Sequence, residues 1–380
     1  MLSYPAAASL TVALSTACAT WLHHSSRRAG GYGRPAVAPV AASLLANAFA
    51  ALLFDGATAY VTRGMVAFLL LWLASSKAVA FMCGRGPLAA RRWTLPQFIA
   101  LYALPLLPAM AGGGVGKSGS SSSSSGAGGH ISGRRSRGLL VSSAGKVALW
   151  VAALACLALR PPQVVKEALY VVAMWGWLGC AMDGAGSLAL AWGLQLQPTF
   201  APLWEAHSVS RFWGQVWNLA ASSAVRCSVY EPILEGCWVR PRPVPGAKQS
   251  SRAEQAPLHR TRHAKGGRPP RAALALCVSC LVSGLVHEAI VWYISGASVK
   301  GAWLAFFAVQ GPVILAERWV INRLGEAGIK PPTTLRVTVT LLTLLGLSHY
   351  LFFEPVERIP LVHEFVARMS RNFQTVWALL

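Results

Sequence analysis

His287 and Glu288 form an ionisable pair inside a long apolar run, residues 272–294, which reads AALALCVSCLVSGLVHEAIVWYI. An ionisable side chain is costly inside a bilayer, so one that occurs there usually serves a function. A neutral imidazole is well suited to take a proton from a hydroxyl group near neutral pH. One turn earlier, Ser283 and Gly284 are small enough to let another helix or a substrate approach the ring. His287 is therefore a candidate general base, and a hydrogen-bonded packing role is the alternative.

A second constellation, FWGQVWN, occupies residues 212–218. Trp213 and Trp217 are four residues apart, so on a helix they would stack on one face, with Gly214 leaving a notch beside them and Asn218 ending the stripe. Aromatic and amide side chains at this density do not suit a membrane span, but they suit an amphipathic helix at the membrane surface. This pattern favours an interfacial anchor, and a substrate site is the alternative.

Other polar residues in apolar runs have simpler interpretations. Lys77 lies toward one end of its run and can extend its ammonium group to the interface. His349 lies near the end of the last run beside Tyr350, where a packing role is as reasonable as a site. Cys277 and Cys280 have the spacing of metal ligands, but no second Cys or His pair accompanies them, so the sequence predicts no metal site.

Composition and hydropathy place these residues in a membrane protein. Of the 380 residues, 54% are hydrophobic and only 12% are charged, against roughly 25% charged in soluble domains. A span needs about 20 apolar residues. The sequence predicts an all-α polytopic membrane protein, a single domain over residues 1–380, with about eight or nine transmembrane helices. The apolar runs cover residues 2–22, 36–54, 65–82, 95–111, 139–159, 164–182, 272–294, 302–321 and 335–353, and residues 183–200 are expected to be re-entrant or interfacial.

The net charge of +21 resides mainly in connectors. A Gly/Ser-rich segment, residues 112–138, is predicted to be a flexible linker, and residues 240–271 form a long basic loop. Both are expected on the cytoplasmic side, with contact to anionic headgroups, and their composition argues against nucleic-acid binding. Smaller basic clusters within residues 27–34 and 85–92 fall on the opposite side if all nine runs cross. Either one early run fails to cross, or the weaker clusters are overruled by the long loops.

Several segments resemble one family, the plant long-chain-alcohol O-fatty-acyltransferases. These membrane wax synthases are related to the membrane-bound O-acyltransferases. The FWGQVWN block followed by GLVHE in an apolar helix is the specific part of the resemblance. The similar segments are LFDGATAYVTRG to MCGRGPL (53–88), SRFWGQVWNLAASSAVRCSVYEPI (210–233), LVSGLVHEAIVWYI (281–294), FFAVQGPVILAERWV (306–320) and HYLFFEPV (349–356).

The resemblance implies that a fatty acyl group is transferred from acyl-CoA to a long-chain alcohol to form a wax ester. It also implies an intramembrane reaction chamber among the helices, the endoplasmic reticulum membrane as location, and no cofactor besides the co-substrate acyl-CoA. His287 matches the family's catalytic His, and Asn218 matches its second active-site position. Gln215 and Val216 stand where the family usually has two Arg.

The expected mechanism gives each residue a role. His287 acts as general base, and Asn218 holds the imidazole tautomer or donates to the developing oxyanion. Cations at a cytoplasmic mouth bind the CoA phosphates. The expected substrate-binding residues are Phe212, Trp213, Trp217, Ser283, Glu288, Arg211 and Arg226, with the basic loop.

Three alternatives stay open at this point. The acceptor alcohol could be a sterol, a diacylglycerol or a specialised alcohol, since hydropathy does not define the shape of a chamber. A non-catalytic membrane scaffold would fit the departure at Gln215 and Val216. A proton-coupled transporter could use His287 and Glu288 as a relay, although the sequence shows no internal repeat.

Overall fold

The computed structural model describes residues 2–27, 32–108, 128–190, 192–240 and 269–359. Within these ranges the regular structure is helical apart from an isolated bridge between Pro108 and Leu196. In the described residues, eight helical segments are long and apolar enough to cross a membrane, which confirms the all-α polytopic membrane fold. They are Tyr4–Ser25, Arg34–Leu53, Tyr60–Met82, Val141–Ala158, Gln163–Leu190, Pro270–Ser295, Ala302–Glu326 and Thr333–Glu357.

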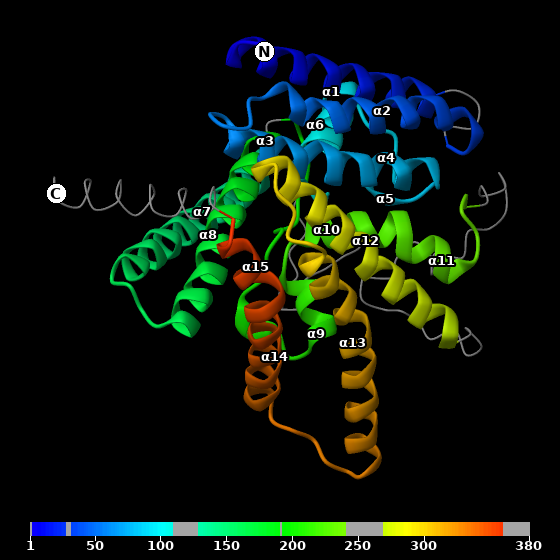
Figure 1. Ribbon diagram of the computed structural model, residues 1–380. Coiled ribbons are helices and arrows are strands. Elements are labelled where there is room, and N and C mark those ends of the chain that lie inside the picture. Colours follow the sequence, from blue (N-terminus) through cyan, green and yellow to red (C-terminus); the bar gives the residue numbers. More distant parts are fainter. Residues whose placement is uncertain (1, 28–31, 109–127, 191, 241–268, 360–380) are drawn as a thin grey trace.

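The N-terminal half of the chain forms most of one bundle. Its elements are α1 (Tyr4–Arg27), η1 (Arg34–Ala36), α2 (Val37–Ala50), η2 (Ala51–Leu53), α3 (Tyr60–Val66), the π-helix η3 (Ala67–Ala74), α4 (Ser75–Met82), α5 (Gly86–Ala89), α6 (Leu95–Ala103), α7 (Gly128–Ala158) and α8 (Gln163–Leu190). Figure 1 shows α1, α2 and the continuous helix α3–η3–α4 side by side, with α7 and α8 paired at one flank.

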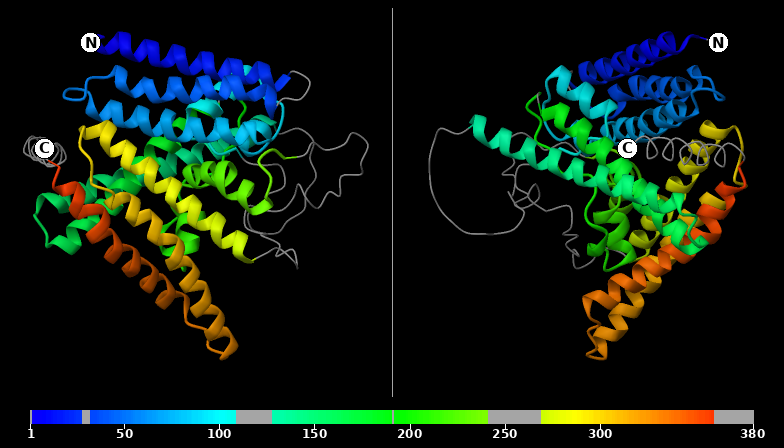
Figure 2. Two further views of the ribbon diagram at one scale, coloured as in Figure 1. Left: turned by 45° about the vertical axis from the view of Figure 1, so that its right-hand side comes forward. Right: turned by 90° about the vertical axis from the view of Figure 1, so that its left-hand side faces the viewer.

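The C-terminal half adds a broken helical segment and two long hairpins. Its elements are η4 (Leu203–Glu205), α9 (Val209–Arg211), the π-helix η5 (Phe212–Val216), α10 (Leu219–Val225), the π-helix η6 (Arg226–Tyr230), α11 (Glu231–Glu235), α12 (Pro269–Ser295), α13 (Ala302–Glu326), α14 (Thr333–Ser348), the π-helix η7 (His349–Phe353) and α15 (Glu354–Glu357). In Figure 2, α12 follows α3 and α4 in the row of helices, while α13 and α14 project away from the bundle.

The apolar run at residues 95–111 does not span the membrane. Helix α6 ends at Ala103, and Leu104 is extended (φ −102°, ψ 155°) because it precedes Pro105. Lys77 donates to the carbonyl oxygens of Leu101 and Leu104, at 2.7 and 2.5 Å, and so occupies the negative end of α6. Lys77 is only 2% exposed, so the prediction that its ammonium group reaches the interface is wrong.

The failure of this run to cross resolves the disagreement among the basic clusters. One candidate span precedes the basic segment at residues 27–34. Three precede the segments at 85–92 and 112–138, and five precede the segment at 240–271. All four numbers are odd, so this count predicts that all four basic segments lie on one side of the membrane. The ends of α1, α4 and α11 and the start of α12 do lie at the same side of the molecule in Figure 1. That this side is cytoplasmic stays a prediction of the positive-inside rule.

Helix α7 extends into the predicted linker. It begins at Gly128, so the linker prediction is wrong for residues 128–138, and residues 112–127 lie outside the part that the structure describes. A helix that is already nucleated lengthens without a second nucleation cost, although each Gly still disfavours it by about 1 kcal/mol relative to Ala. Helix α8 likewise continues to Leu190 and includes part of the segment expected to be re-entrant. The basic loop is described only at its ends, since residues 241–268 also lie outside the described ranges.

Candidate active site around His287

The hydrogen bond of His287 fixes which ring nitrogen can act as a base. Its Nδ1 lies 2.7 Å from the carbonyl oxygen of Ser283, one turn earlier in α12. A carbonyl oxygen only accepts, so Nδ1 carries the proton in this contact and Nε2 of the neutral ring has a free lone pair. His287 is partly exposed between the helices. Its Nε2 is therefore the atom that can take a proton from a substrate.

Three aromatic side chains surround the His287 ring. Phe307 of α13 stacks on it, with ring centroids 3.9 Å apart and an interplanar angle of 24°. Trp72 of η3 meets it edge to face at 4.6 Å, and Trp303 of α13 does so at 6.0 Å. These contacts come from two elements, α13, which follows α12 in the chain, and η3, which lies far from both in the sequence. They fix the ring orientation and surround the imidazole with apolar groups.

Glu288 is engaged with the backbone of the next helix. Its Oε1 accepts hydrogen bonds from the backbone N–H groups of Trp303 and Leu304, at 3.1 and 3.3 Å. These N–H groups lie in the first turn of α13, where no intrahelical acceptor exists and a negative charge is stabilising. Glu288 thereby places Trp303 beside His287. The structure shows a capping role for this carboxylate, whereas its predicted contact with a substrate stays a prediction.

Gly284 permits the close approach of α12 and α13. A Cβ at this position would lie 2.9 Å from both the Cα and the carbonyl oxygen of Leu304. The small residue beside His287 therefore admits a helix, which is one of the two possibilities that the sequence left open. Farther along the same interface, Cys277 packs against Gly311, so the cysteine with metal-ligand spacing fills a helix contact.

The FWGQVWN block is not one amphipathic surface helix. It consists of the single π turn η5, after which Trp217 is extended (φ −98°, ψ 122°). Because the helix ends there, Trp217 stacks on Phe212 (5.5 Å, 20°) and does not share a helix face with Trp213. Phe212 and Val216 are buried. The predicted amphipathic helix is therefore wrong, since the helix ends within the block, while its role as an interfacial anchor stays a prediction.

Asn218 is the N-cap of α10. It adopts the left-handed conformation (φ 42°, ψ 67°), and its Oδ1 accepts a hydrogen bond from the N–H of Ala221 at 3.2 Å. Asn tolerates this backbone conformation better than most residues and is a preferred N-cap. The residue is 5% exposed. No hydrogen bond joins Asn218 to His287 among the described contacts, so the two predicted catalytic residues are not paired directly.

The two motifs meet through α13 instead. Trp213 packs against Phe307 with ring centroids 5.5 Å apart, and its Nε1 donates to Oε1 of Gln310 at 3.1 Å. Phe307 therefore contacts both Trp213 and His287. Sequence reasoning missed Phe307, Gln310 and Trp72, because aromatic and amide residues in an apolar run read as core packing until the fold brings them together.

The two predicted phosphate-binding arginines have acidic neighbours. Nη2 of Arg211 lies 3.0 Å from Oε2 of Glu205, and its Nη1 donates to Oε1 of Gln215. An Arg at position 215 would place a like charge beside Arg211, so Gln215 fits this arrangement. Arg226 pairs with Glu231 at 3.2 Å. All four of these acidic and basic side chains are partly exposed, so contact with an anion stays a prediction.

His349 belongs to a second polar contact. Its Nδ1 lies 2.8 Å from Oε1 of Glu167, which is 1% exposed and belongs to α8. Gln163 donates to the same oxygen at 2.7 Å. The pair ties η7 to α8, so the helix-packing role expected for His349 is the one that the structure shows.

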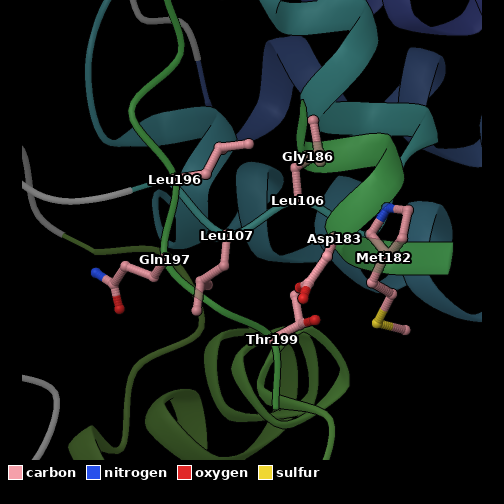
Figure 3. Close-up of a pocket in the computed structure, with 9 residues that line it drawn as sticks. Leu106, Leu107, Met182, Asp183, Gly186, Leu196, Gln197 and Thr199 are labelled. Atoms are coloured by element: carbon pink, nitrogen blue, oxygen red, sulfur yellow. The ribbon is translucent and has the colours of Figure 1, made fainter. Parts of the chain in front are cut away.

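A small cavity lies between the segment after α6, helix α8 and the segment after α8. It is a partly open pocket, and Figure 3 shows Asp183 and Thr199 pointing into it. The lining includes none of the predicted site residues, so a chamber at His287 stays a prediction. The cavity is lined by Pro105, Leu106, Leu107, Met182, Asp183, Gly186, Leu196, Gln197 and Thr199.

Comparison with known proteins points to one group of membrane enzymes. The chain is similar to acyl-CoA–sterol O-acyltransferase 1 of Arabidopsis thaliana (26% identity over 251 residues, 65% of this chain and 62% of that one). It is similar to the long-chain-alcohol O-fatty-acyltransferase of Simmondsia chinensis (27% over 274 residues, 68% and 64%). It also matches the probable long-chain-alcohol O-fatty-acyltransferase 8 of Arabidopsis thaliana (26% over 171 residues, 45% and 43%).

These matches confirm the predicted resemblance to the long-chain-alcohol O-fatty-acyltransferases. The matched regions span less than two thirds of the length of each of these three relatives, between 43% and 64%. No protein-family model matches the chain.

Proposed function

We propose that this relative of the plant long-chain-alcohol O-fatty-acyltransferases is an acyl-CoA:alcohol O-acyltransferase that forms wax esters. The observation that carries the proposal is the geometry of His287: an oriented neutral imidazole with Nε2 free, held among aromatic rings inside a membrane span. The relatives named above support the reaction class and the long-chain acceptor.

In the proposed reaction, Nε2 of His287 accepts the proton of the alcohol hydroxyl while its oxygen attacks the thioester carbonyl carbon. The tetrahedral intermediate collapses, the C–S bond breaks, and the imidazolium returns the proton to the CoA thiolate. The products are the ester and free CoA, so protons balance. General-base assistance of this kind is worth about 10² to 10⁴ in rate. The Ser283 carbonyl keeps the proton on Nδ1 throughout.

Substrate binding is divided between the membrane and the cytoplasmic side. Apolar helix walls accept both hydrocarbon chains, since each buried CH₂ contributes about 0.8 kcal/mol. Trp213, next to Phe307, and the stacked pair Phe212 and Trp217 form part of these walls. The CoA phosphates are bound on the basic side by Arg211, Arg226 and the loop at residues 240–271.

Asn218 supports this site indirectly in the present proposal. As N-cap it fixes the start of α10, whose Ala221 and Ala224 pack in one buried cluster with Trp72 of η3 and Ile290 of α12. Loss of the cap displaces the wall on which His287 depends. The enzyme is proposed to act as a single membrane domain in the endoplasmic reticulum, with anionic headgroups at its basic loops.

A sterol is the second candidate acceptor. It is favoured by the similarity to an acyl-CoA–sterol O-acyltransferase, which extends over 65% of this chain. Both acceptors present one hydroxyl on an apolar body, so the chemistry at His287 would be the same.

The proposal is tested by expression in a host that lacks neutral-lipid synthesis, followed by incubation of its membranes with labelled acyl-CoA and a panel of alcohols. Wax ester formed from long-chain alcohols, and lost in His287→Ala, is the expected result. Steryl ester alone would transfer the assignment to the sterol acceptor. No ester with any acceptor, from protein that is present in the membrane, would overturn the proposed function.

A further inference from the structure

The indole N–H of Trp72 is a buried donor with no hydrogen-bond partner in the described part of the chain. The residue is 6% exposed and packs in the cluster that joins η3, α10 and α12. Leaving a buried N–H without an acceptor costs free energy, and such groups in native proteins require an explanation. An oxygen supplied by a ligand would satisfy this donor.

The position of Trp72 connects the free donor with His287. The two ring centroids are 4.6 Å apart, with an interplanar angle of 68°. Trp72 comes from the π-helix η3, and π turns are rare and frequent at functional sites. A donor at this distance from the candidate base is within reach of the atoms that react there.

The other two indoles near the site have their N–H groups engaged. Nε1 of Trp303 donates to the carbonyl oxygen of Phe352 at 2.9 Å, and Nε1 of Trp213 donates to Gln310 at 3.1 Å. Of these three tryptophans, Trp72 alone keeps its donor available. Packing by itself would not distinguish them, because all three also make ring contacts.

We infer that Nε1–H of Trp72 donates a hydrogen bond to the thioester carbonyl oxygen of acyl-CoA and stabilises the oxyanion of the tetrahedral intermediate. This assignment rests on the proposed function and makes Trp72 a catalytic residue. As the alcohol oxygen bonds to the carbonyl carbon, the C=O electron pair moves to the oxygen, where the indole N–H meets it. The pair returns when the C–S bond breaks and the thiolate takes the proton from His287.

Trp72 thereby takes the oxyanion role, one of the two roles expected for Asn218. The Asn218 side chain is engaged at the N-terminus of α10, through the bond to Ala221. A donor for an oxyanion must be preorganised and held away from water. Trp72, fixed between Phe68, His287 and the α10 cluster, meets both requirements.

The test uses the full-length protein and two substitutions that separate donation from packing. Trp72→Phe keeps an aromatic ring and removes the donor, whereas Trp72→His is a poorer fit that restores an N–H. We expect the kcat of Trp72→Phe to be about 10² to 10³-fold lower than that of the wild type. The kcat of Trp72→His should be at least tenfold higher than that of Trp72→Phe. A packing role predicts the opposite order. Trp319→Phe, a change at a 61% exposed position of α13, is the matched control and leaves kcat unchanged.

Binding of an S-alkyl-CoA, which lacks the carbonyl oxygen, reports folding independently of the donor. We expect Trp72→Phe to bind this thioether as the wild type does. Two results would overturn the assignment and leave the proposed function standing. One is a kcat of Trp72→Phe within twofold of that of an active wild type. The other is thioether binding by Trp72→Phe that is weakened in proportion to its loss of activity. A wild type that forms no ester overturns both.

Discussion

The ring of Phe307 lies 3.9 Å from the ring of His287, at an angle of 24°, so a residue of α13 covers one face of the candidate base. The same phenyl ring contacts Trp213, at 5.5 Å. Phe307 is therefore the side chain through which the aromatic block and the His-bearing helix are joined. Its position explains how two motifs some 70 residues apart, separated by the basic loop, can serve one site.

Replacing Phe307 by Leu should lower activity more than stability. Leu keeps apolar volume but cannot stack on the imidazole, so the ring of His287 gains freedom to leave its reactive orientation. We expect kcat to fall about tenfold, since misplacement of a catalytic group is costly, with little change in KM for acyl-CoA. Phe49→Leu, at a 61% exposed position of α2, is the control. Equal kcat in Phe307→Leu and Phe49→Leu would contradict the positioning role.

Glu288→Ala should destabilise the α12–α13 hairpin. The change removes the acceptor of two backbone N–H groups at the start of α13. Loss of an N-cap costs about 1 kcal/mol, so the melting temperature in detergent should fall by a few degrees. Glu288→Gln keeps an oxygen acceptor and should be intermediate. Glu326→Ala, a 66% exposed side chain at the other end of the same helix, should have no effect. If Glu288 were instead a proton relay, Gln would be as inactive as Ala while remaining stable.

Much of the fold could be predicted from the sequence because each span is a local property. A run of apolar residues is sufficient to indicate a transmembrane helix. The exception, residues 95–111, has the right hydropathy but carries Pro105, and its helix ends at Ala103. The carbonyl oxygen of Leu101, in the last turn of this helix, accepts a hydrogen bond from Lys77, which is 24 residues away in the sequence. A contact at this separation has no signature in a hydropathy window.

The site was predictable only in part, for a related reason. His287 could be identified because a His inside an apolar run is exceptional. Its neighbours Trp72 and Phe307 could not, because aromatic residues are ordinary in such runs. The role of Asn218 depended on a backbone conformation, φ 42°, that no residue type alone specifies. The N-cap role of the Asn218 side chain could therefore be assigned only from the structure.

The topology deduced from the failed fourth span can be tested by cysteine labelling in sealed microsomes, using a variant without other cysteines. Arg92→Cys follows three spans and should react with a membrane-impermeant maleimide from the cytoplasmic side. Thr58→Cys follows two spans and should react only after the membrane is opened. Both positions are exposed. Labelling of both residues from the same side would show that the counting of spans is wrong.

Acid should weaken the contact between α11 and the segment after α4. Nη2 of Arg85 lies 2.7 Å from Oε2 of Glu235, and Nη2 of Arg240 lies 2.8 Å from its Oε1. Burial alone would raise the pKa of Glu235, but the hydrogen bonds from Arg240 and Arg85 outweigh it and hold the pKa below its usual 4.5. A depressed carboxyl pKa contributes stability above pH 4.5, and this contribution is lost as the pH falls through the folded-state value.

The measurement is the difference in melting temperature between the wild type and Glu235→Gln, followed from pH 7 to pH 3.5. The wild type should be the more stable at pH 7, and the difference should shrink below pH 4.5. Glu326→Gln, whose ion pair with Arg323 is 66% exposed on both sides, should show no such trend. A difference for Glu235→Gln that is constant over this range would contradict the assigned pKa direction.

Nε2 of His287 is the proposed general base, and single-turnover ester formation by the purified protein separates this role from a packing role. The variant is His287→Gln, and His24→Gln is its matched control. Nδ1 of His24 lies 2.8 Å from the carbonyl oxygen of Thr20, four residues earlier, as Nδ1 of His287 does with Ser283, but His24 is exposed on the surface of α1. We predict that His287→Gln lowers the rate of ester formation at least 10²-fold with binding of acyl-CoA retained, and that His24→Gln equals the wild type. Ester formation at the wild-type rate in His287→Gln would contradict the account.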